Sequence, residues 1–415
     1  MVNWNGIELP ESFYQDNNTC FIHGDCREVL SSIRGVGSAI VTDPPYELGF
    51  MGKSWDSKGV SFQKETWDVI RKSCKSGSML LSFGGSRTQH RIACAIEDAG
   101  WELRDVLMWV YGSGFPKSMD ISKAIDKSRK QVGEVIGVNK NGAGNKPNGN
   151  SFDDDNYVWK KEYEITAPAS PESTLWSGWG TALKPAYEPI ILAMNPLDKT
   201  FANNALKYGV AGLNIDGCRV GANGGGTHCS NRNAEGRCLG HPDRSGTAFG
   251  LTYHAEEMTK DQGRFPANFL HDGSEEVVEM FPNSKDGVAV GQNASSGNVY
   301  GNGKGLISQG KGVVKHGYGG SGSAARFFYS AKASRSERGV ANNHPTVKPL
   351  ALMEYLCKLV KMPEYNLIID PFMGSGTTLI ACSKLGIPCI GIDSDEQSCE
   401  LATIRYLRSL ANGEL

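Results

Sequence analysis

The chain has 415 residues, of which 39% are hydrophobic and 21% charged, so it is long enough for two or three domains with substantial cores and is not globally disordered. Its net charge of −2 excludes a uniformly basic surface, so a polyanion would have to bind a local patch. No apolar run approaches the length of a membrane span, no signal peptide is recognisable, and the 11 scattered cysteines do not form a disulfide pattern. These features predict a cytoplasmic protein.

The N-terminal part of the chain alternates short apolar runs with helical patterns. The expected strands are residues 20–25, 39–43, 78–85 and 103–110, and the expected helices are residues 26–33, 67–75 and 87–100. Alternation of this kind predicts an α/β domain in which helices cover both faces of a parallel sheet.

The second of these strands runs into the sequence IVTDPPYELGF, residues 40–50, which combines a carboxylate, two prolines and an aromatic ring. An exocyclic amine on a nucleic-acid base is a poor nucleophile, because its lone pair is delocalised into the ring. Asp43 and the Pro44 carbonyl would accept the N–H hydrogens of such an amine, the two prolines would keep the turn rigid, and Tyr46 would stack on a base that has left the duplex. The alternative is a proline-stiffened loop with a helix-capping Asp.

The middle of the chain follows a different pattern. Residues 139–152 are rich in Asn and Gly and predict a surface loop, and the strand–helix alternation stops after residues 184–196. Residues 287–322 contain 12 glycines. Residues 287–348 contain eight basic residues and a single acid, Glu337, which gives a local charge of 8 − 1 = +7. This charge is as consistent with a surface that binds nucleic acid as with a solvated loop.

Near the C-terminus the sequence predicts a strand at 366–370, a tight glycine turn, a helix and a strand at 388–393. Gly374 and Gly376 would let the backbone approach a ligand closely, and Asp393 has the spacing of an acid that binds ribose hydroxyls. A dinucleotide fits poorly, because Asp370 would repel a pyrophosphate. S-adenosylmethionine, which has a ribose and an amino-acid group but no phosphate, fits better, and a purely structural turn is the alternative.

Three motifs in a fixed order carry a resemblance to a known family. DPPY at 43–46, HPTVKP at 344–349 and DPFMGSGTT at 370–378 resemble the motifs of the DNA amino-methyltransferases. Their order resembles that of the β class, in which the cofactor half follows the catalytic half and the target-recognition region. HGDCREVL at 23–30 also resembles the usual start of the family, and the overall spacing is similar to that of phage and prophage members.

The resemblance implies a Rossmann-like S-adenosylmethionine-dependent methyltransferase fold that is circularly permuted. Residues 1–195 would form the catalytic half, with a polar insert near 131–175, and residues 342–415 the cofactor-binding half. Residues 196–341 would form an inserted, irregular target-recognition region. The permutation places the strand at 20–25 beside the strand at 388–393.

The resemblance also implies a role for individual positions. The catalytic residues would be Asp43, Pro44, Pro45 and Tyr46. S-adenosyl-L-methionine would be bound by Asp25 at its adenine end, by Asp393 at its ribose, by Thr346 and Lys348 near its carboxylate, and by the glycine turn, made of Asp370, Pro371, Phe372, Gly374, Ser375, Gly376 and Thr377. DNA would be contacted by Lys304, Lys311, Lys315, Arg326, Lys332, Arg335 and Arg338.

The predicted reaction is transfer of a methyl group to the N6 amine of adenine in duplex DNA. The rival is N4 methylation of cytosine; an acid at the first position of the DPPY motif usually accompanies adenine in the family, so Asp43 favours adenine. More remote alternatives are a non-catalytic DNA-binding protein and an RNA methyltransferase on the same fold. A second copy of the chain (a homodimer) and a cognate restriction endonuclease are further partners to consider. The expected location is the cytoplasm of a bacterial or phage-infected cell.

The resemblance implies no metal. A cluster of soft ligands nevertheless lies in the middle of the chain, at His228, Cys229, Cys238 and His241. Their spacing is not the two-residue knuckle of a zinc site, so loose thiols in a loop are the preferred interpretation.

Overall fold

A single mixed sheet organises the protein. The computed structural model describes residues 2–48, 59–112, 114, 118–139, 163–220, 264–285, 288–290, 315–317, 321–331 and 347–411. Its 10-stranded sheet has the order β16-β11-β7-β10-β6-β5-β17-β18-β4-β3. The strands of this sheet are β3 (Tyr14–Gln15), β4 (Thr19–His23), β5 (Gly37–Thr42), β6 (Cys74–Phe83), β7 (Glu102–Val110), β10 (Tyr187–Met194), β11 (Phe269–His271), β16 (Tyr329–Ser330), β17 (Ile368–Asp370) and β18 (Cys389–Asp393).

Strands from the two ends of the chain lie side by side in this sheet. β17 pairs in parallel with β5 on one side and with β18 on the other, and β18 pairs in parallel with β4. The predicted neighbourhood of residues 20–25 and 388–393 is therefore confirmed, with Ile22 opposite Ile392. The two ends of the chain complete one sheet, as a permuted fold requires.

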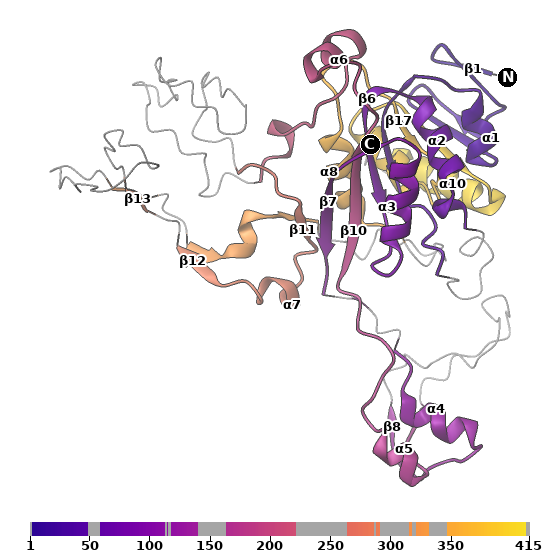
Figure 1. The fold of residues 1–415 in the computed structure, drawn as a ribbon, viewed down its shortest axis with the longest axis vertical. Helices are drawn as coiled ribbons and strands as arrows, with labels where there is room; N and C mark the ends of the chain where they lie inside the picture. The colour runs from indigo at the N-terminus through magenta and orange to yellow at the C-terminus, as the bar shows by residue number, and fades with distance from the viewer. Residues whose placement is uncertain are drawn as a thin grey trace.

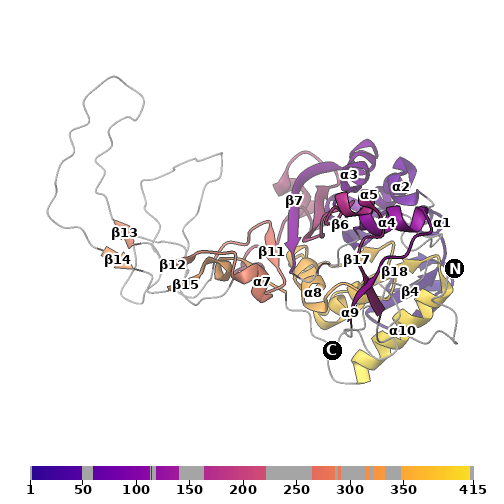
Figure 2. The ribbon, with the colours of Figure 1, turned by 90° about the horizontal axis from the view of Figure 1, so that it is seen from below.

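Helices cover both faces of the sheet, as predicted (Figures 1 and 2). On one face lie α1 (Cys26–Ser31), α2 (Lys64–Ser73) and α3 (Gln89–Asp98), and on the other lie α8 (Leu350–Leu359), α9 (Thr377–Lys384) and α10 (Glu396–Ala411). Successive residues of β5 point to opposite faces of the sheet: Ile40 packs with the first set of helices and Val41 with the second. The described helices include none that is long and apolar enough to cross a bilayer.

The sheet is not purely parallel, because β10 runs antiparallel to both neighbours, β6 and β7. The strand–helix alternation predicts a parallel sheet and no strand at 187–194. Hydrophobic periodicity does not reveal the direction of a strand. The chain leaves the sheet at the end of β7, passes through a long insertion and re-enters at the same edge, so β10 runs antiparallel to β7. A second difference is that β11 and β16 of this sheet come from residues 196–341, which were predicted to form an inserted, irregular region. The α/β layering itself is as predicted.

The insertion between β7 and β10 forms an arm that projects from the body of the protein (Figure 1). Its described elements are α4 (Ile121–Ser128), β8 (Val135–Asn139), β9 (Tyr163–Thr166) and α5 (Pro171–Leu175). The outer end of the sheet, toward β11, continues into the region expected to recognise DNA. The elements there are α7 (Glu275–Val278), β12 (Asn283–Lys285), β13 (Val288–Val290), β14 (Lys315–Gly317) and β15 (Ser321–Ser323). α6 (Phe201–Tyr208) belongs to the same stretch of sequence but lies beside β6, where the Asn204 amide donates to the Ser76 carbonyl.

Two further elements complete the description. β1 (Val2–Trp4) and β2 (Ile7–Leu9) form a separate hairpin at the N-terminus.

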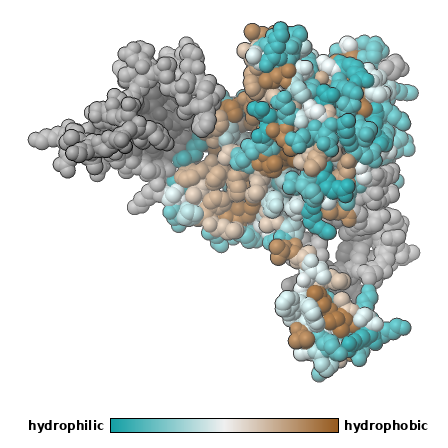
Figure 3. Space-filling model, in the orientation of Figure 1, coloured by the Kyte–Doolittle hydropathy of each residue, from teal (hydrophilic) through white to brown (hydrophobic). Residues whose placement is uncertain are grey.

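At the outer end of the large sheet, β7 exposes Leu103, Val106 and Met108, and hydrophobic atoms gather over β7 and β11 in Figure 3. The described helices therefore cover this end of the sheet only in part.

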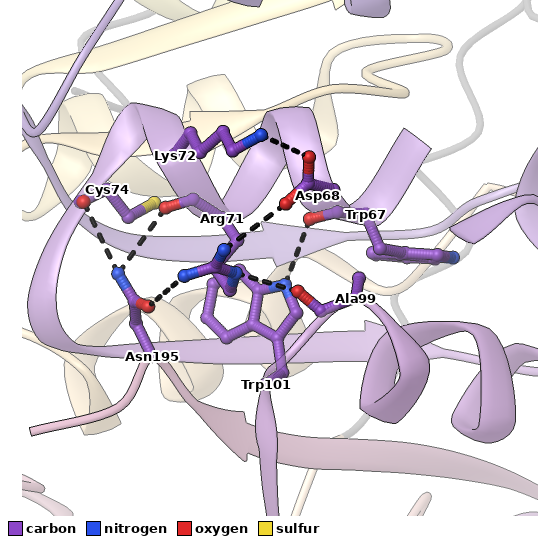
Figure 4. Close-up of polar contacts among 8 residues, drawn as sticks. All are labelled: Trp67, Asp68, Arg71, Lys72, Cys74, Ala99, Trp101 and Asn195. Atoms are coloured by element: carbon purple, nitrogen blue, oxygen red, sulfur yellow. Dashed lines mark hydrogen bonds and ion pairs between the residues drawn. The ribbon is translucent and has the colours of Figure 1, made fainter. Parts of the chain in front are cut away.

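A polar network fastens α2 to the sheet (Figure 4). The side-chain amide of Asn195, just after β10, donates to the Lys75 carbonyl at 2.9 Å and more weakly to those of Arg71 and Cys74. Arg71 in turn donates to the Ala99 carbonyl at 2.7 Å, and Trp101 to the Trp67 carbonyl at 3.1 Å. These bonds tie carbonyls of α2, of the start of β6 and of the segment before β7 to one set of side chains.

We expect Asn195→Ala to lower the free energy of unfolding by about 2–3 kcal/mol, because the carbonyls of Cys74 and Lys75 and the Arg71 guanidinium each lose a buried hydrogen bond. Asn268→Ala, which removes an exposed amide bonded to Asp105, is the matched control and should cost less than about 1 kcal/mol. Denaturant unfolding of both variants measures the difference. Equal losses would show that the network adds no stability.

Candidate functional site

The parallel strands β4, β18, β17 and β5 end at the same edge of the sheet, and an acid stands at or just after each end. The register places Ile369 opposite Ile40, Asp370 opposite Gly391, and Asp393 opposite His23. Asp25 follows β4, and Asp43 follows β5. Ligands of open α/β sheets bind outside the carboxyl ends of such strands. The fold thus brings together four acids that are far apart in the chain.

Asp370 lies beneath the glycine turn and is 2% exposed. Its carboxylate accepts the Thr42 hydroxyl at 2.6 Å and the Phe372 N–H at 3.2 Å. Burial raises the pKa of Asp370 to about 7, against the opposing effect of the hydrogen bonds from Thr378, Thr42 and the Phe372 N–H. Asp370 therefore ties the end of β17 to the end of β5.

The glycine turn, residues 370–377, is anchored by Asp393 from the next strand. The Gly374 N–H donates to Asp393 at 2.8 Å, and the Asp395 N–H donates to its other carboxylate oxygen at 3.0 Å. Burial raises the pKa of Asp393, and these two N–H groups act in the opposite direction. Gly374 and Gly376 have φ values of +50° and +77°, which side-chain-bearing residues rarely adopt.

Arg405 of α10 clamps the glycine turn from behind, a contact that the sequence analysis missed. Its guanidinium donates to the Ser375 carbonyl, to the Ser375 hydroxyl at 2.7 Å and to the Thr377 hydroxyl at 3.2 Å. The charge is thereby directed at the backbone of the turn. The helix α10 was not among the predicted elements, so no position was predicted for Arg405.

Asp25 caps α1 and pairs with Arg27. Its carboxylate accepts the Arg27 N–H at 2.9 Å and lies 2.5 Å from the Arg27 guanidinium, which also donates to Gln63. The Gly24 N–H donates to the Asp393 carbonyl at 2.8 Å, so Asp25 follows directly on the segment that borders Asp393. Asp25 therefore lies at the predicted edge of the sheet, with its carboxylate bound to its own chain.

At the end of β5, the Asp43–Tyr46 segment meets Lys348 and Glu188 in a closed network. The Lys348 ammonium lies 2.6 Å from Asp43 and 3.2 Å from Glu188. The Tyr46 hydroxyl lies 2.9 Å from Asp43 and 3.1 Å from Glu188, and it accepts from Lys348 at 3.2 Å. The ammonium and the hydroxyl thus each lie within hydrogen-bonding distance of the same two carboxylates.

The network is largely withdrawn from water. The side chain of Lys348 is 8% exposed, and those of Asp43 and Glu188 are 24% and 21% exposed. Burial raises the pKa of Asp43, the Lys348 cation lowers it, and the Glu188 charge raises it again, with a net upward shift. Burial lowers the pKa of Lys348, but Asp43 and Glu188 together outweigh burial and raise it. The site therefore holds an ammonium firmly between two acids.

Local packing fixes the turn that carries Tyr46. The Pro45 carbonyl accepts the Ser61 hydroxyl at 2.7 Å, and the Tyr46 carbonyl accepts the Thr88 hydroxyl at 2.8 Å. Gly85 lies so close to the ring that an added Cβ would meet Tyr46 atoms at 3.1 and 3.3 Å. The backbone on both sides of Tyr46 is therefore held, and its ring rests against a glycine.

The two groups of predicted site residues meet at this edge, but with one unexpected contact. Lys348, expected near a methionine carboxylate, lies against Asp43. Glu188, which sequence reasoning missed, stands in β10, and Tyr111 approaches it at 3.5 Å. The signal for Glu188 in the sequence is a carboxylate near the start of the apolar run of β10. Its place beside Asp43 follows only from the direction of that strand.

The predicted DNA contacts are described only in part. Arg326 donates to the Gly322, Ser323 and Ser284 carbonyls and stacks on Phe327, so its guanidinium is engaged by its own chain. Lys315 lies in β14. Several predicted residues lie outside the described part of the chain: Lys304, Lys311, Lys332, Arg335, Arg338 and Thr346.

The question of a metal is answered only for the part of the chain that the structure describes. There, no group of three or more His, Cys, Asp or Glu residues is placed to hold a metal ion. The suspected ligands His228, Cys229, Cys238 and His241 lie outside those residues.

The chain matches a family model for N6/N4 methyltransferases, described as DNA methylase, over residues 38–404. Curated relatives match over shorter segments. The type II methyltransferase M2.LlaDCHI of Lactococcus lactis subsp. cremoris is 38% identical over 73 residues, which is 18% of this chain and 27% of the relative. M.SmaI of Serratia marcescens is 41% identical over 66 residues, which is 16% of this chain and 22% of the relative. The chain thus spans only about a quarter of the length of these relatives.

Solved structures resemble the protein more loosely. The crystal structure of the M1.HpyAVI–SAM complex is 14% identical with a TM-score of 0.38, covering 93% of this chain and 99% of that one. The PvuII DNA methyltransferase, described as cytosine-N4-specific, is 13% identical with a TM-score of 0.42, covering 94% of this chain and 86% of that one.

Gly376→Ala should destabilise the protein more than Gly386→Ala by about 1–3 kcal/mol. Both glycines have positive φ, at +77° and +63°, so both variants carry the same kind of backbone strain. Only at Gly376 would the new Cβ also meet the Ala402 Cβ, at 2.8 Å, whereas Gly386 faces open space. Denaturant unfolding compares the two; equal losses would mean that α10 does not press against the turn.

Proposed function

The chain belongs to the N6/N4 DNA methylase family, and from this premise we propose that it transfers a methyl group from S-adenosyl-L-methionine to the N6 amine of adenine in duplex DNA. The observation that carries the proposal is the convergence of the Asp43–Tyr46 segment and the glycine turn at one edge of the sheet, joined by the Thr42–Asp370 hydrogen bond. The acceptor that we propose for the amine and the turn that we propose for the methyl donor are thus adjacent.

The residues around the glycine turn suit S-adenosylmethionine. Asp393 stands at the end of the strand next to the turn, where a ribose diol would find an acceptor, and Asp25 follows the strand beyond it. Asp370 and Asp393 make this edge acidic, which disfavours a phosphate and favours a cationic or zwitterionic ligand. Gly374 and Gly376 allow the turn its positive-φ backbone, and Gly376 also lets α10 pack closely against it. We assign Pro371, Phe372, Ser375 and Thr377 to the wall of the same pocket.

When bound, S-adenosylmethionine supplies a methyl group on a sulfonium: the S–C bond breaks, its electron pair stays on sulfur, and an N–C bond forms from the amine lone pair. Asp43 and the Pro44 carbonyl accept the two N–H hydrogens of the amine and draw its lone pair out of the ring plane. Tyr46 stacks on the extruded base. The raised pKa of Asp43 equips it to take the proton that the methylated nitrogen releases.

N4 methylation of cytosine is the second candidate, because the same amine chemistry serves both bases. Asp43 at the first position of DPPY favours adenine. We assign the target-recognition role to residues 196–341, with the basic residues of its glycine-rich part on DNA phosphates. The recognition sequence is set by contacts in that region, and a homodimer and a cognate endonuclease are proposed partners.

Asp43→Ala should lower methyl transfer from labelled S-adenosylmethionine to duplex DNA by more than about 10²-fold, because the amine loses its main acceptor. Binding of the cofactor should stay within about twofold, since Asp43 lies on the target side of the site. Filter-bound radioactivity and calorimetric titration measure the two quantities. Transfer by the variant at the wild-type rate would contradict the assigned mechanism.

Nucleoside analysis of DNA from cells that express the protein separates the two candidate bases. N6-methyladenine is the expected product, and cells with the Asp43→Ala protein are the control. N4-methylcytosine in its place would assign the second candidate activity. DNA that carries neither base, from cells that contain folded protein, would overturn the proposal.

A further inference from the structure

The number of hydrogen bonds at Asp43 poses a problem for the reaction. Both carboxylate oxygens of Asp43 are occupied, Oδ1 by the Tyr46 hydroxyl at 2.9 Å and Oδ2 by the Lys348 ammonium at 2.6 Å. A base amine that approaches Asp43 has to compete with these donors for the lone pairs of the same two oxygens. A displaced ammonium or hydroxyl in so buried a place needs another acceptor, because an unpaired buried donor is costly.

Glu188 is placed to receive both donors. Its Oε2 lies 3.2 Å from the Lys348 ammonium and 3.1 Å from the Tyr46 hydroxyl. The Tyr46 hydroxyl carries a single hydrogen, so it donates to one carboxylate at a time, whereas an ammonium can donate to both. Neither donor has to leave its position in order to be bonded by Glu188 alone.

Resting on the proposed function, we infer that Glu188 is a positioning residue for methyl transfer: it takes over Lys348 and Tyr46 when the target amine binds Asp43. Glu188 itself does not touch the amine. The Tyr46 ring stays in place to stack on the base, because its hydroxyl passes from Asp43 to Glu188 without moving the ring. Lys348 likewise stays beside Asp43 as a neighbouring cation.

The surroundings of Glu188 support a fixed rather than an adaptable role. It stands in β10 opposite Trp109 of β7, and the next residue, Pro189, accepts the Gly84 N–H at 3.0 Å. Lys348 directly precedes α8, whose buried side chains pack in the core. Both ends of the Glu188–Lys348 contact are therefore set by rigid elements, so the acceptor is preorganised for the exchange.

The charged and titratable groups around Asp43 also give the inference a pH signature. They are Lys348 before α8, Glu188 in β10, Tyr46 in its own segment, Tyr111 behind Glu188, and Asp370 behind Thr42. Asp43 has to be ionised to accept the amine. A negative Glu188 raises the pKa of Asp43, so its neutralisation should lower that pKa and move the acid limb of the rate profile to lower pH.

The test compares Glu188→Gln with the wild type in single-turnover methyl transfer at saturating S-adenosylmethionine. The isosteric amide keeps the volume but presents no charge to Lys348. We expect the rate to fall by about tenfold or more, the acid limb to move to lower pH, and cofactor affinity to change less than about twofold. Glu102→Gln, which removes an exposed carboxylate at the start of β7, should leave all three unchanged.

A double-variant comparison separates positioning from simple structural support. In a Lys348→Met background, Glu188 has only the Tyr46 hydroxyl left to take over, so adding Glu188→Gln should lower the rate by less than about threefold. Equal losses in both backgrounds would mean that Glu188 supports the fold and not the exchange, and would overturn the inference. Wild-type rate and pH profile for Glu188→Gln would overturn it as well.

Glu188→Asp keeps the inference testable if the Gln variant does not fold. It retains the charge but withdraws it by one methylene, so the rate should fall while the acid limb stays in place; a wild-type rate would contradict the inference. A wild-type protein that methylates no DNA would overturn the proposed function and this inference together. Normal wild-type transfer with unaffected Glu188 variants would overturn the inference alone.

Discussion

The pairing of β17 with β5 is the contact on which the rest of the protein depends. It joins segments from opposite ends of the chain. The Thr42 hydroxyl stabilises the pairing by donating a hydrogen bond to Asp370, which is 328 residues away in sequence. Without this pairing the glycine turn and the Asp43–Tyr46 segment would lie on separate pieces. With it, both stand at the carboxyl ends of neighbouring parallel strands, where an open sheet leaves room for ligands.

Burial at this edge controls the chemistry of the acids. Asp370 and Asp393 are both held by hydrogen bonds to the backbone of the turn, yet burial dominates and raises the pKa of each. Their oxygens act mainly as anchors for N–H and O–H groups that would otherwise be unpaired. The turn can therefore keep two glycines at positive φ, because Asp393 fixes it on one side and Arg405 on the other.

Much of this arrangement could be predicted from the sequence, and the reasons for the remainder are physical. Strand–helix alternation and the motif order gave the layers and the neighbourhood of β4 and β18, because those signals are local. The direction of β10 and the helix α10 were missed, and with them Glu188 and Arg405, whose contacts depend on how distant segments pack. Lys348 was singled out, but its position against Asp43 follows from the packing of α8, which no local pattern reveals.

The position of Lys348 explains how a carboxylate so withdrawn from water can serve as an acceptor. Burial and Glu188 both favour the protonated form of Asp43, and a protonated acid would offer the amine one oxygen fewer. The ammonium opposes both effects at a distance of 2.6 Å. Two acids and one cation leave the cluster with one net negative charge, so the carboxylate that we propose as the amine's acceptor is neither fully neutralised by Lys348 nor isolated in a low-dielectric site. The second carboxylate is therefore part of the same electrostatic balance, since without it the cation would be bound to Asp43 alone.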